Sequence, residues 1–284
     1  MELPDLILKK KIKDFLEEDI GFGDITTNTI IEGGGPNKKA LILTRQDGIV
    51  AGLREVSVLF EIFHVKSHVK REDGAQIQAN DVLVELDGPI KGILKGERTA
   101  LNLLMRMSGI ATATYQLVEK VRKVNPTIRI ACTRKTTPGF RYFEKRAVQL
   151  GGGDTHRFCL DDMVLIKDNH LKLVSDIPKL IKQVRKKVSF SKKIEIEVTT
   201  AEQALEAAKE KVDIIMLDNF TVSDVKQAID LLKQNDLRDH LLLEVSGNIT
   251  PENISDFAKL DLDVISLGYL THSIKALDVT LDLQ

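Results

Sequence analysis

The sequence predicts an α/β protein in which an open, incomplete α/β barrel follows a smaller region of mixed helices and strands. After Asn125, short β-branched runs alternate with helical stretches, a pattern typical of parallel strands joined by helices. Six such units are visible, fewer than the eight of a closed barrel. Before them, residues 40–95 carry strand-like runs bounded by Gly and Asp-Gly turns.

The overall composition narrows the functional classes. The 284 residues suffice for a main domain with a smaller partner, and 43% hydrophobic with 29% charged residues is ordinary for a globular enzyme or binding protein. A net charge of -1 gives no overall basic field, so we expect no nucleic-acid partner, although a local cationic site remains compatible. The two cysteines, Cys132 and Cys159, are too few for a disulfide scaffold or a cysteine metal cluster and indicate a reduced, cytoplasmic protein. Charges throughout residues 1–24 predict neither a signal peptide nor a membrane span.

The N-terminal region begins with an amphipathic helix that Gly21 and Gly23 end. Its apolar face consists of Leu8, Ile12, Phe15 and Leu16. The strand-like runs "ALILTRQDGIVAG" and "DVLVELDGPIKG" flank a helical stretch, "GLREVSVLFEIF". A long helix is predicted over residues 96–123, with Gly109 as a kink or joint.

The C-terminal region supplies the six βα units. The predicted strands are residues 127–133, 162–168, 193–198, 212–218, 241–245 and 263–268. The predicted helices are residues 140–150, 174–187, 200–210, 222–234 and 251–260. Because the strands are nearly continuous apolar runs, we expect helices to cover one face of the sheet and the barrel interior to fill the other.

Polar residues follow these strands at the positions where barrel enzymes place their catalytic groups. They are Arg134, Lys135, Lys167, Asp168, Asn169, His170, Glu197, Asp218, Asn219, Ser246, Gly247, Asn248 and Gly268. The glycine-rich stretch "GGGDTHRF" joins a helix to the second strand and so brings His156 and Arg157 to the same rim. Glu195 shares strand parity with Glu197, so an outward orientation of both stays open, and Asn169 and His170 are equally compatible with structural roles.

These residue types indicate the chemistry of the ligands. Arginine and lysine grip carboxylates or phosphates, and His156 extends the cationic set. Glu197 and Asp218 can bind sugar hydroxyls or a hard cation such as Mg²⁺. Small-residue turns at the last strands, at Ser246-Gly247 and Gly268, offer backbone N–H groups to a phosphate. The set predicts a phosphorylated sugar and a second, anionic substrate.

The motifs resemble those of the quinolinate phosphoribosyltransferase family, the decarboxylating nicotinate-nucleotide pyrophosphorylases, from about residue 4 to 282. They are "EEDIGFGDITT", "GERTALNLL", "ACTRKTTPG", "GGGDTHR", "LIKDNH", "IEIEV", "MLDN", "EVSGNIT" and "SLGYLTHSIKALD". Many members have a His-Asn pair where this chain has Asp154-Thr155, which we interpret as a subgroup variant because His156-Arg157 is intact.

The resemblance implies a type II phosphoribosyltransferase architecture, with an N-terminal α/β sandwich over residues 1–108 and an open α/β barrel over 109–270. Residues 271–284 would pack with the N-terminal domain. It also implies Mg²⁺ dependence and a head-to-tail homodimer with shared active sites, either alone or as a hexameric trimer of dimers. The reaction implied converts quinolinate and phosphoribosyl pyrophosphate to nicotinate mononucleotide, pyrophosphate and CO₂.

The resemblance also implies a role for each site residue. The two carboxylates of quinolinate would be held by Arg134, His156, Arg157, Lys167 and, from the partner subunit, a residue equivalent to Arg98. Lys135 would contact the pyrophosphate, with His272 as a weaker candidate. Glu197 and Asp218 would hold the ribose hydroxyls, directly or through Mg²⁺ and water, and with Lys135 form the catalytic set. The 5′-phosphate would be cradled by Ser246, Gly247, Asn248 and Gly268.

Three other interpretations compete with this one. Relatives encoded in molybdenum operons share the "CTRK" and "GGG..HR" elements but depart near "LIKDNH", which is intact here. A Schiff-base lyase using Lys167 would need that lysine in an apolar pocket, whereas here it stands among polar groups. Residues 69–94 resemble the strand-rich hammerhead of biotinyl and lipoyl carriers, but lack a lysine at the hairpin tip in the expected apolar setting.

Overall fold

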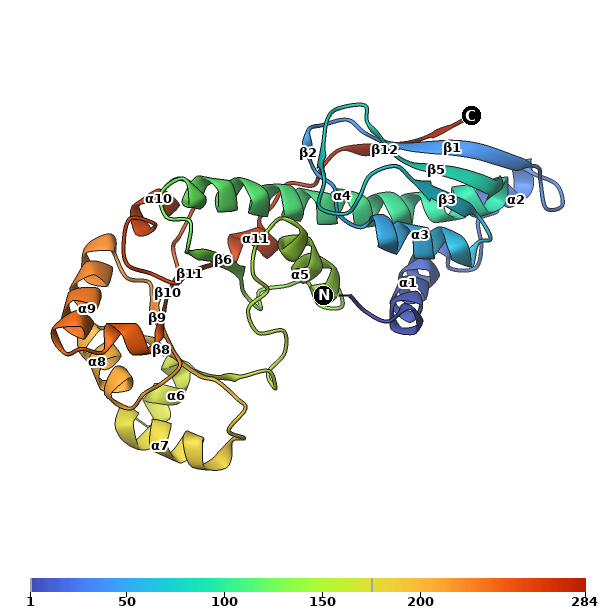
Figure 1. Ribbon diagram of the computed structural model, residues 1–284. Helices are drawn as coiled ribbons and strands as arrows, with labels where there is room; N and C mark the ends of the chain where they lie inside the picture. Colours follow the sequence, from blue (N-terminus) through green and yellow to red (C-terminus); the bar gives the residue numbers. More distant parts are fainter. Residues whose placement is uncertain (1, 175) are drawn as a thin grey trace. The chain divides into compact units, whose positions relative to one another are not determined.

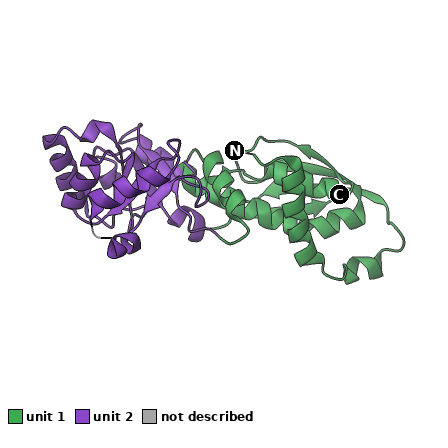
Figure 2. Ribbon diagram, turned by 90° about the horizontal axis from the view of Figure 1, so that it is seen from below, with its two compact units in different colours: residues 1–115, 137–152, 273–284 green, residues 116–136, 153–272 purple. Residues whose placement is uncertain are grey.

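The computed structural model describes residues 2–174 and 176–284, which divide into two compact units (Figure 2). Unit 1 comprises residues 1–115, 137–152 and 273–284, and unit 2 comprises residues 116–136 and 153–272. This division differs from the expected boundary at residue 108. Residues 137–152, which lie between the first two barrel strands in the chain, group with the N-terminal residues.

Unit 1 is built on a four-stranded antiparallel sheet in the order β12-β1-β5-β3 (Figure 1). The strands are β1 (Asn37–Thr44), β3 (Lys66–Val69), β5 (Val82–Pro89) and β12 (Val279–Leu283). Two short strands, β2 (Gly48–Ile49) and β4 (Gln76–Ile77), form a separate pair. Because β12 pairs with β1, the C-terminal segment completes the sheet that the N-terminal residues begin.

The helices of unit 1 bury the apolar faces that the sequence predicts. They are α1 (Asp5–Ile20), α2 (Ile25–Ile30), α3 (Leu53–Ile62), α4 (Ile90–Arg122) and α5 (Arg141–Leu150), with the end of α4 entering unit 2. In α1, Leu8, Ile12 and Leu16 are buried, while Phe15 lies against the rings of Phe140 and Phe143. The predicted amphipathic helix is therefore confirmed.

Unit 2 is an open six-stranded parallel sheet in the order β6-β11-β10-β9-β8-β7. The strands are β6 (Arg129–Cys132), β7 (Val164–Ile166), β8 (Ile194–Val198), β9 (Ile214–Asp218), β10 (Leu242–Ser246) and β11 (Val264–Leu267). Among the described residues, β6 and β7 occupy opposite edges and do not pair with each other. The prediction of an incomplete barrel is therefore confirmed.

The strands of unit 2 are joined by helices, of which α8 packs on β8 and β9 (Figure 1). The helical elements are α6 (Asp168–Leu173), α7 (Ile177–Lys187), α8 (Ala201–Lys209), α9 (Val222–Gln234), η1 (Arg238–His240), α10 (Ile254–Phe257) and α11 (Tyr269–His272). Since all six strands are parallel, the residues that follow them share one edge of the sheet.

Several elements differ from the sequence predictions. The long helix begins at Ile90 rather than residue 96 and continues through Gly109 without a break, so the expected joint is wrong. The predicted helix over 251–260 is helical only at residues 254–257. There the Asn253 side chain bonds the backbone of Thr250 and Asn248, which competes with helix formation. Helices α2, α6 and α11 and strand β12 were not predicted.

Across residues 2–174 and 176–284, every helix is too short or too polar to serve as a membrane span.

Candidate active site

A cavity of about 490 Å³ opens at the carboxyl ends of the unit 2 strands. Ten of the thirteen predicted site residues line it, and all ten belong to unit 2. They are Arg134, Lys135, His156, Arg157, Lys167, Glu197, Asp218, Ser246, Gly247 and Asn248. Residues from every strand end except that of β11 therefore converge as the topology predicts, and β11 itself contributes Ser266.

The positive side of the cavity is formed by Arg134 and Arg157. The Nε of Arg134 is buried and, within the described residues, has no hydrogen-bond partner. Arg157 is 8% exposed. Burial, and then the neighbouring charge of Arg134, lower the pKa of Arg157. Two arginines that destabilise each other's charge at a cavity wall form a site that a bound anion would stabilise.

Lys167 joins this wall from the end of β7. Its Nζ donates to Glu197 Oε1 across the cavity, so the two opposite charges are paired. Its backbone N–H donates to Nδ1 of His170 at 2.8 Å, and its carbonyl accepts from the His170 N–H at 2.8 Å. His170 thus caps the start of α6, which gives it a structural role and fixes the backbone that carries Lys167.

Opposite the cations, the ends of β9 and β10 form a ledge of acid, amide and glycine. The Asn219 side chain donates to Asp218 Oδ2 at 2.8 Å and accepts from the Asn248 amide at 3.0 Å. Asn219 and Asn248 have left-handed backbones, with φ of 60° and 53°. Between them, Gly247 has a φ of 81°, and a Cβ there would overlap the Asn219 side chain. Glycine is therefore required at position 247 for Asn219 to pack against this turn.

Gly268 and His272 lie beside the cavity without lining it. A Cβ on Gly268 would come within 2.8 Å of His272 Nε2 and 2.9 Å of Lys135 Cδ. Gly268 is thus needed for the close approach of these two side chains. The Lys135 carbonyl accepts a hydrogen bond from Thr271 Oγ1 at 2.7 Å, which ties the Lys135 backbone to α11.

Arg98, the remaining predicted residue, is exposed on α4 in unit 1 and does not line this cavity.

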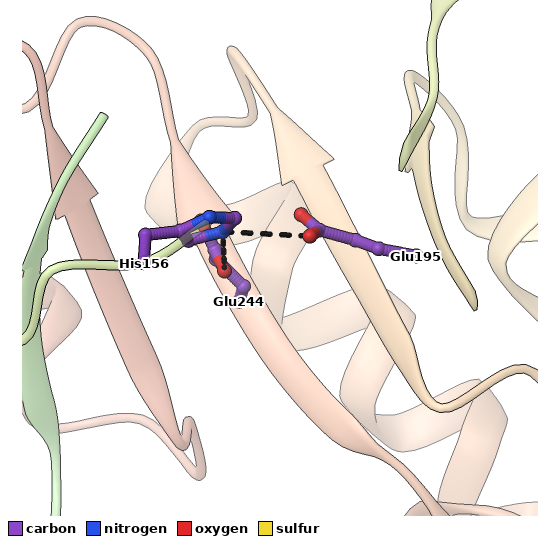
Figure 3. Close-up of side chains that lie close together, drawn as sticks. All are labelled: His156, Glu195 and Glu244. Carbon is purple, nitrogen blue, oxygen red and sulfur yellow. Dashed lines mark hydrogen bonds and ion pairs between the residues drawn. The ribbon is translucent and has the colours of Figure 1, made fainter. Parts of the chain in front are cut away.

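At the floor of the cavity, His156 meets two buried carboxylates, Glu195 of β8 and Glu244 of β10 (Figure 3). The His156 Nε2 lies 3.4 Å from Glu195 Oε2 and 3.2 Å from Glu244 Oε2. Glu195 is 0% exposed and Glu244 is 1% exposed. Burial lowers the pKa of His156, but the hydrogen bonds and charges of the two glutamates outweigh it and raise the pKa to about 10.

The hydrogen bond at the other ring nitrogen, Nδ1, shows which nitrogen of His156 carries the imidazole proton. The Arg157 backbone N–H donates to His156 Nδ1 at 2.7 Å, which requires a lone pair on that atom. Burial and the neighbouring Glu244 raise the pKa of Glu195. The lone pair on Nδ1 places the ring proton on Nε2, the atom that faces the two carboxylates.

Sequence reasoning missed Glu195 and Glu244 as part of the site. It left open whether Glu197 and Glu195 point outward, whereas Glu197 lines the cavity and Glu195 faces His156, so both point inward. The signal was present in the strands, since a carboxylate inside an apolar β-branched run is costly to bury without a partner. The sequence could not show that this partner is His156, which lies 88 residues from Glu244 along the chain.

Two groups of side chains could hold a metal ion. Glu197 and Asp218 line the same cavity and offer half-buried carboxylate oxygens, the ligands that Mg²⁺ prefers. The ligand atoms of His156, Glu195 and Glu244 also lie within 4.8 Å of one another. In that second group Nε2 faces both carboxylates, while three of the four carboxylate oxygens have no hydrogen-bond partner among the described residues.

The cavity is thus lined by guanidinium and ammonium groups, by carboxylates and by a glycine turn. Such an arrangement can hold a planar anion by its carboxylates while a sugar phosphate lies on the ledge.

Comparisons with known proteins agree with this arrangement. Residues 24–108 match the model of the quinolinate phosphoribosyl transferase N-terminal domain, and residues 110–282 match that of its C-terminal domain. The chain is 46% identical over 262 residues to a probable nicotinate-nucleotide pyrophosphorylase (carboxylating) of Archaeoglobus fulgidus, covering 92% of this chain and 98% of the relative. The corresponding protein of Methanocaldococcus jannaschii is 45% identical, with 96% of each chain covered. The crystal structure of NadC from Streptococcus pyogenes is similar with a TM-score of 0.93 at 37% identity, over 100% of this chain and 99% of that one.

Proposed function

The chain belongs to the quinolinate phosphoribosyltransferase family, and from that premise we propose that its cavity joins quinolinate to the ribose of phosphoribosyl pyrophosphate. The products are nicotinate mononucleotide, pyrophosphate and CO₂. The observation that carries the proposal is the convergence of Arg134, Arg157 and Lys167 in one cavity that Glu197 and Asp218 also line.

We propose that quinolinate lies against the cationic wall. Its two carboxylates would be held by Arg134, Arg157 and Lys167. The buried Nε of Arg134, which has no hydrogen-bond partner in the described part of the chain, supports this. Because Lys167 is paired with Glu197, a carboxylate of quinolinate would take the place of Glu197 as the partner of the lysine. The same exchange would release Glu197 toward the ribose hydroxyls, which couples the binding of the two substrates.

Phosphoribosyl pyrophosphate would occupy the ledge. Ser246, Gly247 and Asn248 would cradle its 5′-phosphate, supported by the left-handed turn at Gly247. Lys135 would contact the pyrophosphate. Gly268 and His272, which lie beside Lys135 rather than in the cavity wall, would act at the pyrophosphate end.

Asp218 and Glu197 have the oxygen donors that fit Mg²⁺, and they would hold the ion directly or through water. The ion would neutralise charge on the departing pyrophosphate. Asn219 fixes the orientation of the Asp218 carboxylate through the bond to Oδ2.

The chemistry needs orientation and charge stabilisation more than a protein nucleophile. The pyridine nitrogen attacks C1 of the ribose as the C1–oxygen bond to pyrophosphate breaks through an oxocarbenium-like state. The ring nitrogen is then cationic and accepts the electron pair left when the 2-carboxylate departs as CO₂. Lys167 is poorly suited to the competing Schiff-base chemistry, because its Nζ is paired with Glu197 among polar groups rather than lying in an apolar pocket.

We also propose a homodimer in which Arg98 of one subunit reaches the cavity of the other. The exposure of Arg98 on α4, outside its own chain's cavity, supports this. The cytoplasm is the compartment we propose, because Cys132 and Cys159, both among the described residues, form no disulfide.

The direct test is to incubate the purified protein with quinolinate, phosphoribosyl pyrophosphate and Mg²⁺, and to measure nicotinate mononucleotide and CO₂. Nicotinate in place of quinolinate is the control, because a wall built for two carboxylates should use it poorly. Absence of product, or equal use of the two acids, would contradict the proposal.

A further inference from the structure

The imidazole of His156 is held at both nitrogens by the protein. Nε2 contacts Glu195 and Glu244 in the barrel interior (Figure 3). Nδ1 accepts the Arg157 backbone N–H. With both nitrogens held by the protein, the ring has a fixed orientation in the cavity that it lines. It links the floor of the barrel to the backbone of the next residue, Arg157.

The segment that the ring holds is in a costly conformation. His156 has a φ of 50°, a left-handed backbone that residues other than glycine rarely adopt. Such strain persists where surrounding contacts impose it. Here the Asp154 side chain accepts the His156 N–H at 2.8 Å, and the Asp154 backbone bonds the edge of β6. The ring of His156 supplies the second anchor, on β8 and β10.

We propose that Glu195 and Glu244 are positioning residues for the anionic substrate, which act through His156 to fix the backbone that places Arg157 in the cavity wall. This inference rests on the proposed function. It adds Glu195 and Glu244 to the site, and it gives His156 the role of a strut behind Arg157.

The burial of two acids supports a positioning role. Apolar residues of similar size would fill the same space without the cost of burying carboxylates. Both oxygens of Glu195 and Oε1 of Glu244 lack a geometric hydrogen-bond partner within the described chain. The close contacts of both carboxylates with a basic side chain converge on His156 Nε2. The two glutamates come from strands on either side of β9, so they fix the ring from two directions.

The test uses Glu195→Gln, Glu244→Gln and the double variant, which keep side-chain volume and remove charge. We expect the KM for quinolinate to rise by about 10–100-fold, as is typical when the partners of a binding group are removed. The KM for phosphoribosyl pyrophosphate should change by less than about twofold. Glu210→Gln, which removes an acid paired with Lys182 in the same unit, is the matched control and should leave both values unchanged.

A second measurement is independent of turnover. Nitrogen NMR of the imidazoles should show His156 protonated on Nε2 with a lone pair on Nδ1, and this signature should be lost in the double variant. Should the double variant fail to fold, the two single variants carry the test. If the wild-type protein makes no product, the proposed function fails, whereas the NMR signature still shows whether Glu195, Glu244 and the Arg157 backbone hold the His156 ring.

Three outcomes would overturn the inference. One is loss of the signature in variants that keep both KM values. Another is an equal rise of both KM values, which would indicate general loosening of the barrel. The last is a divalent metal that copurifies with the wild type and is absent from the variants, since Nε2 would then face an ion rather than two carboxylates.

Discussion

At the scale of single residues, the cavity brings the like charges of Arg134 and Arg157 near each other. Arg134 leaves a buried Nε without a partner among the described residues, and the pKa of Arg157 is lowered by its burial and by Arg134. A free-energy cost of this kind is offset when an anion binds. An anionic substrate bound as proposed would therefore stabilise the arrangement of these side chains.

Replacing Arg134 or Lys167 with Ala should remove most of the activity while the fold persists. Truncating one partner of a buried, hydrogen-bonded charge pair costs about 2–5 kcal/mol, which corresponds to a loss in kcat/KM of roughly 30-fold or more. Steady-state kinetics with circular dichroism check this. Arg122→Ala, on α4 and 54% exposed, is the matched control. Unchanged turnover in either site variant would contradict the assignment.

The cluster at His156 should make stability depend on pH. The pKa of His156 is raised from 6.5 to about 10 because Glu195 and Glu244 outweigh burial, so the folded protein keeps a proton that the unfolded chain releases. The free energy of unfolding should therefore fall as pH rises from 6.5 to about 10, by at most about 1.4 kcal/mol per pH unit. Arg157, the charged neighbour on the same segment, stays protonated throughout this window.

Urea unfolding across that range measures the slope. The double variant Glu195→Gln, Glu244→Gln removes the cause and should show a smaller slope than the wild type. The same slope in both proteins would place the titrating group elsewhere.

At the scale of elements, glycines decide where α4 and α5 can pack. A Cβ on Gly109 would overlap the Lys275 carbonyl oxygen and lie 3.0 Å from the Ala276 Cα, and one on Gly151 would overlap the Ala111 carbonyl oxygen. The first glycine of "GGGDTHRF" thus lets α5 end against α4. The sequence could identify both glycines as special, but not that close packing is the reason.

Gly109→Ala should destabilise the protein despite the better helix propensity of alanine. The propensity gain is about 1 kcal/mol, whereas a backbone clash of this kind costs about 1–3 kcal/mol. Thermal unfolding should show a lower midpoint. Gly34→Ala, with no atom near the added Cβ, is the control and should leave the midpoint almost unchanged. A raised midpoint for Gly109→Ala would contradict this prediction, because it would show that the backbone at Lys275 moves to accommodate the added methyl group.

At the scale of the whole molecule, the proposed shared site makes a prediction about mixed subunits. In the proposed dimer, each cavity contains Arg134 of its own chain and Arg98 of the partner chain, so Arg98→Ala and Arg134→Ala remove contributions from different chains. A mixed dimer would contain one cavity with both defects and one with neither.

Mixing the two inactive variants after dissociation should therefore recover up to about a quarter of the wild-type activity, since half of random dimers are mixed and each has one intact site. Heterodimers verified by mass spectrometry, with Arg98→Ala mixed with itself as the control, check this. No recovery in verified heterodimers would show that Arg98 does not act across subunits.

The sequence by itself determined the order of helices and strands in the barrel, its incomplete closure and ten of the residues at the cavity. These follow from local periodicity and from the parallel topology that places all strand ends at one edge. Even there, α6 was missed, because its start depends on His170 capping the backbone of Lys167.

Only the tertiary structure decided which side chains meet inside the barrel and across unit 1. The placement of residues 137–152 with the N-terminal unit and the meeting of His156 with Glu195 and Glu244 depend on contacts between distant parts of the chain. Such contacts leave no periodic signal, because the free energy that fixes them comes from partners that the chain brings together only when folded.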